Sequence, residues 1–202
     1  PEFTQVDMEL SFVEEDDVME FNEGLIAHVF KEVAGVDVKL PIKRMTYKDA
    51  MEKYGSDKPD LRFGMEITDI TADVKDMDFV VFKSAIEVGG SVRGLCLKGG
   101  ADLGRKPLDK LGEFVKTYKA KGLAWIQFKE DGIKSSISKF LTDEVTESIK
   151  ETMNAENGDA VLIVADKNSV VFQSLGALRL HLAKEFDLIK DKNEFNFTWI
   201  TE

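Results

Sequence analysis

Cysteine is nearly missing from this chain, and long apolar runs are missing altogether. The one cysteine, Cys96, excludes an intrachain disulfide, which is typical of proteins in a reducing cytoplasm. It lies among apolar neighbours in "VRGLCLKG", which favours a small buried side chain over a reactive thiol. No apolar run approaches the roughly 20 residues that a bilayer crossing needs, and the first residues are too acidic and polar for a signal peptide. We therefore expect a cytoplasmic protein with no membrane partner.

Residue groups that mark common enzyme and metal sites are also scarce. The two histidines, His28 and His181, lie far apart in the sequence, and no Cys/His cluster indicates zinc. The stretch "GGADLGRK" lacks the ending of a Walker P-loop, and its glycines have the wrong spacing for a dinucleotide loop. Two alternatives stay open: a phosphate bound on backbone amides at this glycine turn, and an anion contacted by His181 beside Arg179. The sequence assigns no metal site and no catalytic residue.

Charge is distributed unevenly along the chain. The formal net charge of −11 argues against a general nucleic-acid binder. Residues 1–35 hold ten acidic side chains and one lysine, whereas residues 98–140 hold ten basic side chains and five acidic ones. This contrast predicts two units with different surfaces.

The first stretch, "PEFTQVDMELSF", alternates strictly between apolar and polar residues. In a strand, one face would hold Val6, Met8, Leu10 and Phe12. The other face would hold the amide of Gln5 and the carboxylates of Asp7 and Glu9. Alternation with a period of two predicts a half-buried strand, because successive side chains leave a pleated backbone on opposite sides. Such a polar face could bind a cationic group such as an ammonium, and an exposed edge strand is the alternative.

The next segments predict two helices and a linker. Acidic residues crowd the first turn of the helix predicted in "EEDDVMEFNEGLIAHVFKEVAG" at 14–35, where the helix dipole favours them, and Gly35 is placed to end it. Thr46 is a candidate N-cap for a second helix that Gly55 ends. The turn-rich "GSDKPDLRFG" that follows is the predicted domain boundary. The apolar stripe of the first helix comprises Val18, Phe21, Leu25, Val29 and Val33.

The rest of the chain alternates between β-branched apolar runs and amphipathic helices. The order of these segments predicts an α+β fold in which helices cover a mainly antiparallel sheet. Thr142 is placed to cap the middle one of the three helices. The predicted strands span 78–86, 91–99, 123–129, 159–166 and 195–200, and the predicted helices span 106–122, 142–154 and 169–186.

Four stretches together resemble a known family. They are "PEFTQVDMELSFV", "RMTYKDAMEKYGSDKPDLRFG", "GLCLKGGADLGRKPLDKLGEFVKTYKAKGLAWIQ" and "GDAVLIVADKNSVVFQSLGALRLHLAKEF". In collinear order over essentially the whole chain, they resemble bacterial aspartyl-tRNA synthetase. The resemblance implies a partial class II catalytic core at residues 1–61, a GAD insertion domain at 62–192, and a strand returning to the core at 193–202.

The resemblance also implies a role for the polar face of the first stretch. In that family this strand is the second half of the motif 2 hairpin, in the sheet that floors the active site. Asp7 would attract the ammonium of L-aspartate, and Gln5 and Glu9 would support or orient it. The family's motif 1, motif 3, anticodon-binding barrel and most of motif 2 have no counterpart here, so we expect an inactive fragment. ATP and Mg²⁺ would be cofactors of the parent enzyme only. The parent would be a homodimer, and the rest of the synthetase would be a partner of this segment.

The basic middle of the chain offers a second hypothesis, in which the insert contacts the acceptor side of tRNA. A solvated helix face is the alternative. A stand-alone GAD-type tRNA-binding module, related to the tRNA-dependent amidotransferase B subunit, is the other functional alternative, and the synthetase-like first stretch argues against it. The candidate tRNA contacts are Arg105, Lys106, Lys110, Lys116 and Lys139.

Overall fold

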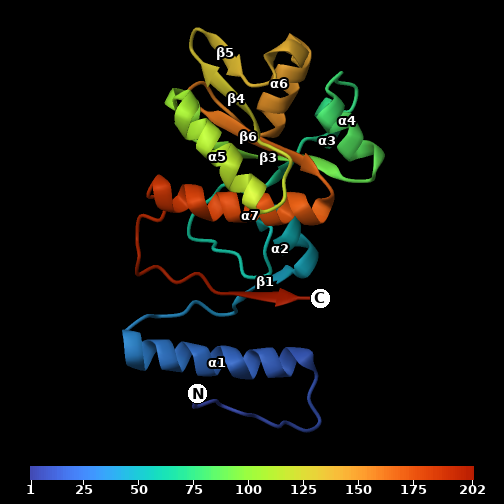
Figure 1. Cartoon of the computed structure of the whole chain (residues 1–202). Coiled ribbons are helices and arrows are strands. Elements are labelled where there is room, and N and C mark those ends of the chain that lie inside the picture. The colour runs from blue at the N-terminus through green and yellow to red at the C-terminus, as the bar shows by residue number, and fades with distance from the viewer. The chain divides into compact units, whose positions relative to one another are not determined.

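The computed structural model describes all residues, 1–202, and they form two compact units (Figure 1). The first unit comprises Pro1–Arg44 with Phe195–Trp199, and the second comprises Met45–Glu194 with Ile200–Glu202. The domain boundary predicted between residues 61 and 62 lies inside the second unit. That this position separates a catalytic-core part from a GAD insertion domain stays a prediction. None of the helices combines the length and the hydrophobicity that a bilayer crossing requires.

The first unit contains one long helix, α1 (Glu15–Ala34), as the sequence predicts. The carboxylate of Asp17 accepts a hydrogen bond from the backbone N–H of Glu14 at 2.9 Å and so satisfies a donor at the start of the helix. Gly35 ends the helix with φ 67°, a left-handed conformation that glycine adopts without strain.

The apolar stripe of α1 is not the face that this unit buries. Phe21 is 54% exposed and Val33 is 83% exposed, whereas Glu23 is the one buried residue of the helix. The carboxylate of Glu23 accepts a hydrogen bond from the indole N–H of Trp199 at 3.0 Å, and the Phe30 ring packs edge-on against Phe197. The 3.6-residue period thus identified the helix correctly but did not identify the side that packs, because apolar residues lie on both sides.

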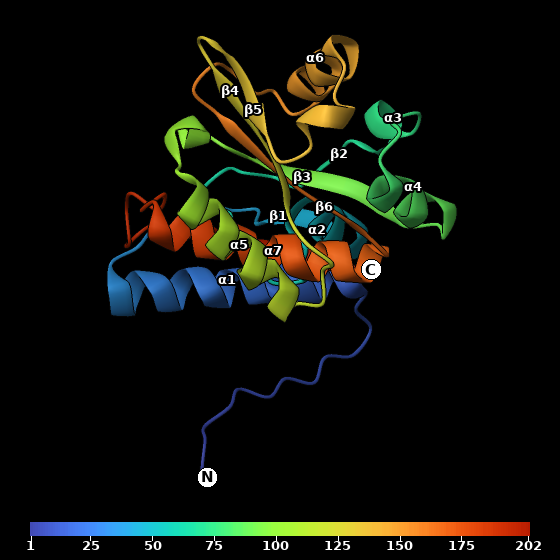
Figure 2. The same ribbon diagram turned by 45° about the horizontal axis from the view of Figure 1, so that its top comes forward.

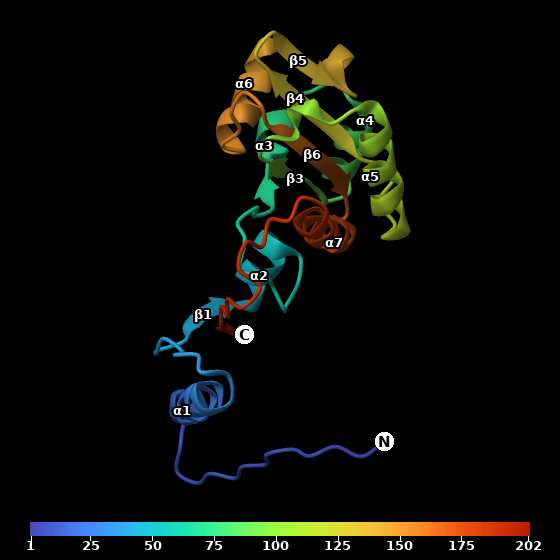
Figure 3. The same cartoon turned by 90° about the vertical axis from the view of Figure 1, so that its left-hand side faces the viewer.

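The predicted first strand is absent from the structure. Residues 1–14 adopt no regular secondary structure, and each of them is exposed (Figures 1 and 3). A strand is stable only when a neighbouring strand satisfies its backbone N–H and C=O groups, and no segment within residues 1–202 pairs with this one. Alternation of side chains therefore predicted a strand that the chain by itself does not form.

Two short strands, β1 (Lys43–Thr46) and β7 (Thr198–Thr201), pair with each other. A C-terminal strand is present as predicted, but it begins at Thr198 and not at Phe195. Helix α2 (Tyr47–Tyr54) follows β1, and the predicted cap is present: the Thr46 hydroxyl accepts from the backbone N–H of Asp49 at 3.0 Å. Gly55 ends α2, and a Cβ there would lie 2.1 Å from the carbonyl oxygen of Phe172. Only glycine fits at that position.

The second unit is built on a five-stranded antiparallel sheet, which confirms the predicted α+β class. Its strand order is β2 (Thr68–Asp69), β3 (Ser91–Leu97), β6 (Ala160–Asp166), β4 (Ala124–Lys129) and β5 (Gly132–Ser135). Short 3₁₀ turns, η1 (Gly100–Asp102) and η2 (Ser138–Phe140), follow β3 and β5.

Helices cover both faces of this sheet. Helices α3 (Thr71–Val74), α4 (Val80–Glu87) and α6 (Asp143–Thr152) pack on one face, and α5 (Arg105–Thr117) and α7 (Asn168–Glu185) pack on the other. In Figures 1 and 2 the strands β3 and β6 lie between two groups of helices, with α3 and α6 on one side and α5 and α7 on the other. Alternate side chains of β6 serve the two cores, because Val161 and Ile163 join the first and Leu162 and Val164 join the second.

The strand predicted at residues 78–86 is wrong, because most of this run forms the helix α4. Phe82 and Ala85, three residues apart, are its buried positions, and that spacing is helical. The run is short and apolar almost throughout, so periodicity cannot separate a buried strand from a buried helix there. Strand β5, which follows the turn at Glu130–Asp131, was not predicted.

Candidate functional site

The three predicted aspartate-binding residues lie in the extended first segment. Gln5, Asp7 and Glu9 are all exposed, and within residues 1–202 none of them forms a hydrogen bond or an ion pair. Because this segment forms no strand, the structure does not bring the three side chains onto one paired surface. Their role in binding an amino acid stays a prediction.

The predicted tRNA contacts gather mainly on one helix. Arg105, Lys106, Lys110 and Lys116 belong to α5, whose buried side holds Leu108, Leu111 and Val115. The fifth candidate, Lys139, lies apart in η2. Since the apolar residues of α5 face the sheet, the cationic residues are left on its solvent side.

Some of these charges are already paired with carboxylates. The Arg105 Nε lies 3.7 Å from a carboxylate oxygen of Asp109, and the Lys116 ammonium lies 2.6 Å from Glu113. Both pairs are well exposed, and exposed ion pairs typically contribute only about 0–1 kcal/mol. Lys106, Lys110 and Lys139 have no ion pair within residues 1–202, so they are available to an external anion.

A groove runs between α5 and the start of β4. Its volume is about 600 Å³, and we call it the α5 groove. Lysines of α5 share its lining with Trp125 and Leu123, so cationic groups and an aromatic ring lie close together. Its polar lining residues are Lys106, Lys110, Lys116, Lys121, Asp109 and Glu113.

The alternative anion site at His181 and Arg179 is not formed. The imidazole of His181 stacks on the Phe114 ring, with centroids 4.4 Å apart, and its Nε2 lies 3.4 Å from a Glu185 carboxylate oxygen. Arg179 is only 1% exposed and does not share that surface. The two residues therefore do not act as one anion contact.

The glycine turn before α5 is held by the protein's own acceptors. The backbone N–H of Gly99 donates to the Asp159 carboxylate at 3.0 Å, and the N–H of Ala101 donates to the carbonyl of Gly158 at 2.9 Å. The N–H of Leu103 donates back to Gly100. These amides have partners already, which weakens the idea that the turn binds a phosphate on its backbone.

Asp159 is the centre of a buried polar cluster, and no local sequence pattern around it predicts this. Its carboxylate accepts hydrogen bonds from the Lys98 ammonium at 2.8 Å and from the backbone N–H of Glu156 at 2.8 Å, in addition to Gly99. Burial opposes its ionisation, but these donors outweigh burial and hold the pKa of Asp159 below its ordinary value. Burial, and next the charge of Asp159, raise the pKa of the Cys96 thiol to about 11, so this cysteine is protonated near neutral pH.

Arg179 forms a second buried polar centre. Its guanidinium lies 4.0 Å from the centroid of the Phe63 ring and 4.9 Å from that of Tyr54. Burial lowers the pKa of Arg179 to about 10, so it is still charged at neutral pH. Four backbone carbonyls lie within 2.8–3.1 Å of its nitrogens, those of Asp60, Phe63, Gly64 and Met65. One side chain of α7 thus fixes the linker that follows α2.

Comparison with known proteins places this fold in a family. Residues 82–175 match the model of the GAD domain, and they contain most of α4, all of α5 and α6, β3 to β6 and nearly half of α7. The whole chain is 89% identical to 34% of an aspartate–tRNA ligase from Clostridium botulinum (strain Eklund 17B / Type B). It is 88% identical to 34% of the ligase from Clostridium beijerinckii, and 71% identical to 34% of one from Clostridium perfringens (strain ATCC 13124).

The resemblance to bacterial aspartyl-tRNA synthetase is confirmed. The similarity extends over all 202 residues of the chain, at 89% identity to the ligase from Clostridium botulinum. The chain spans about a third of the length of the curated synthetases that it matches, 34% in each case. Residues 82–175 are its GAD domain.

Proposed function

We propose that this chain serves as a segment of an aspartate–tRNA ligase that activates L-aspartate with ATP and transfers it to tRNA in the cytoplasm. The observation that carries the proposal is the 89% identity over all 202 residues to an aspartate–tRNA ligase. The residues that would touch L-aspartate are Gln5, Asp7 and Glu9, and their exposed and unpaired side chains leave them free to do so. ATP and Mg²⁺ would be bound by the complete enzyme, which we expect to be a homodimer.

We expect the 202-residue chain to be inactive by itself. Aminoacyl activation requires the amino acid, ATP and the metal to be held together in a preorganised site. Three polar side chains on an unpaired segment cannot hold these groups in place. The measurement is aspartate-dependent exchange of pyrophosphate into ATP, with a complete aspartate–tRNA ligase as the positive control. Exchange above background by the purified chain contradicts the expectation.

We further propose that the GAD domain contacts the acceptor side of tRNA through the α5 groove. Support comes from three lysines on its lining without an ion pair (Lys106, Lys110 and Lys121) and from the ring of Trp125 beside them. Lysines neutralise phosphates, and an aromatic ring can stack on an unpaired base. The overall charge of −11 means that any such binding has to be local to this groove.

This proposal predicts a steep salt dependence. With about three phosphates neutralised, the binding constant for a tRNA acceptor-stem hairpin falls by about 50-fold between roughly 50 and 200 mM salt. We expect the double variant Lys106→Glu/Lys110→Glu to abolish the shift of the hairpin in a native gel at low salt. Its matched control, Lys75→Glu/Lys167→Glu, changes the same charge at exposed positions outside the groove and is expected to weaken binding by less than about threefold.

Two results decide against the groove. Equal loss of binding in both double variants would mean that only the net charge matters. No binding by the unaltered chain at low salt would exclude the contact itself, leaving a solvated helix face as the explanation of the lysines.

A further inference from the structure

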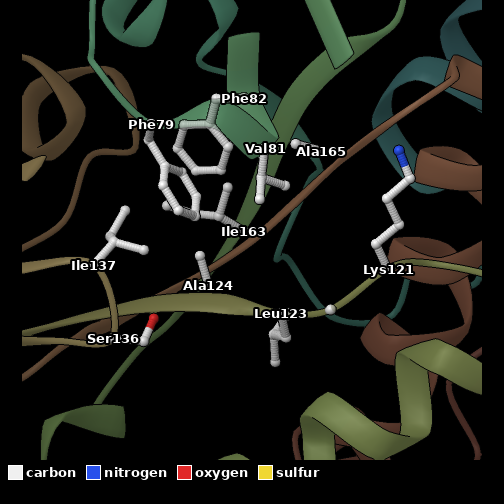
Figure 4. A pocket seen from close by; sticks show the side chains of 11 residues that line it. Phe79, Val81, Phe82, Lys121, Leu123, Ala124, Ser136, Ile137, Ile163 and Ala165 are labelled. Atoms are coloured by element: carbon white, nitrogen blue, oxygen red, sulfur yellow. The ribbon is translucent and has the colours of Figure 1, made fainter. Parts of the chain in front are cut away.

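An apolar cavity opens between α4 and the β4 end of the sheet. Its volume is about 270 Å³, and its walls come from α4, β4, β6 and the turn before η2 (Figure 4). The cavity lies on the opposite face of the sheet from α5 and α7. It shares Lys121, Gly122 and Leu123 with the α5 groove and no other lining residue.

The deep part of this cavity belongs to the core. Phe82 and Ile163 are each 1% exposed and Ile137 is 5% exposed, so the cavity reaches side chains that are almost fully buried. The Phe79 and Phe82 rings meet edge to face with centroids 4.8 Å apart and form one aromatic wall. A dry apolar cavity of about 150 Å³ holds benzene. The larger volume here fits an aromatic group of two fused rings.

The rim of the cavity carries the polar groups. Lys121 is exposed and has no ion pair, and Figure 4 shows it on the side of the cavity across from Phe79 and Ile137. The Ser136 hydroxyl oxygen accepts a hydrogen bond from the backbone N–H of Trp125 at 3.0 Å, which leaves its own hydrogen free to donate. Figure 4 shows Ser136 beside Ile137, on the opposite side of the cavity from Lys121, so Lys121 alone is the cation for an anion at its own side, and no carboxylate lines the cavity.

We propose that this cavity binds small aromatic carboxylates, with a bicyclic ring against Phe79, Phe82 and Ile163 and the carboxylate toward Lys121. Apolar walls with a few convergent polar groups are the usual composition of small-molecule sites. The hydrophobic burial of the ring supplies most of the affinity, and the ammonium selects the anion.

The test uses 2-naphthoate and its neutral analogue of the same shape, 2-naphthamide, with the 202-residue chain. Chemical-shift titration is expected to give a dissociation constant on the order of 1 mM for naphthoate, as for a good ligand of this size. Naphthamide is expected to bind about threefold more weakly, since an exposed ion pair contributes modestly. The shifted amides are expected to be those of α4, β4 and residues 136–137.

Variants separate the ring from the charge. Ala124→Phe fills the cavity from β4 and is expected to remove naphthoate binding, and Val81→Phe does the same from α4 should the first variant fail to fold. Lys121→Gln is expected to make naphthoate and naphthamide bind equally, whereas the matched control Lys184→Gln on α7 leaves the threefold preference intact. Lys106→Glu/Lys110→Glu is expected to leave naphthoate binding unchanged, which distinguishes this site from the α5 groove.

Three results overturn the proposal. They are an absence of shifts at 10 mM naphthoate, shifts confined to elements other than those that line the cavity, and a preference for naphthoate that survives Lys121→Gln.

Discussion

Replacing Arg179 by methionine is expected to lower the free energy of unfolding of the second unit by about 3–5 kcal/mol. The substitution keeps much of the apolar stem but removes every donor to the four carbonyls of the linker at residues 60–65. A buried carbonyl that loses its only donor costs about 1–3 kcal/mol, and some of the four will be reached by water. The packing of the guanidinium between Tyr54 and Phe63 is lost as well. Urea unfolding monitored by far-UV circular dichroism measures the change.

Two further variants test this explanation. Arg62→Met removes another arginine of the same linker, one that pairs with Asp60 at 2.7 Å but is 31% exposed, and it should lower the free energy of unfolding much less than Arg179→Met does. Arg179→Lys keeps the charge but loses the planar guanidinium and its stacking. Its free energy of unfolding is therefore expected to lie between those of Arg179→Met and the unaltered chain. Unfolding of Arg179→Met at the same urea concentration as the unaltered chain would show that the four contacts contribute no net stability.

Arg179 also shows where the sequence stops being informative. The helix around it was predicted correctly, and its neighbours Leu175, Leu178 and Leu182 are buried as expected. An arginine among them is ordinarily taken as surface, because charged side chains are seldom fully buried. Its four acceptors lie 114–119 residues away along the chain, so no local pattern signals the contact.

The elements that the sequence predicted well are those that local chemistry determines. Thr46 and Thr142 cap their helices through side-chain oxygens, and Gly35 and Gly55 end theirs with a positive φ. These contacts join residues within a few positions of each other. The strand expected at residues 1–12 failed for the opposite reason, since it depends on a pairing strand that no residue of this chain supplies.

The candidate site divides in the same way. The lysines of α5 could be placed opposite its apolar side from their spacing. Four of the five candidate tRNA contacts, three lysines and Arg105, belong to that helix. Their combination with Trp125 in one groove depends on how α5 packs beside β4. The cavity at α4 could not be predicted at all, because its aromatic wall lies in the segment for which the sequence indicated a strand.

The second large effect is expected at Asp159, in the loop that joins α6 to β6. Asp159→Asn keeps the shape but replaces one acceptor oxygen by an amide that cannot accept from the Lys98 ammonium or from a backbone N–H. We expect a loss of about 2–3 kcal/mol of unfolding free energy at pH 7, because the new NH₂ group faces either the Gly99 N–H or the Lys98 ammonium and the Glu156 N–H, and the remaining oxygen serves only the other side. Asp102→Asn, which changes a fully exposed carboxylate beside Lys129, is the control and should change stability by less than about 0.5 kcal/mol.

The pH dependence of this loss follows from the direction of the pKa shift. Because the pKa of Asp159 is lower in the folded chain than its unfolded value of about 3.9, its contribution is fully present above that pH. The contribution is lost as the pH falls through the folded-state pKa. The difference in urea midpoint between Asp159→Asn and the unaltered chain is therefore expected to be constant from pH 5 to 7 and to shrink below about pH 4. A difference that stays the same down to pH 2 would mean that the ionised carboxylate is not what stabilises the loop.

Cys96 provides a second measurement of the same cluster. Its thiol donates to the Asp159 carboxylate at 3.8 Å, and its pKa of about 11 arises first from burial and then from that carboxylate. Removing the negative charge in Asp159→Asn leaves burial unchanged but lowers the thiol pKa, so alkylation of Cys96 by iodoacetamide at pH 8.5 should become faster. Asp102→Asn is expected to leave the alkylation rate unchanged, since Asp102 is not among the groups that shift the Cys96 pKa. A rate that rises in both variants would point to general loosening of the unit, and a rate that rises only in Asp159→Asn would identify the carboxylate itself as the group that keeps the thiol protonated.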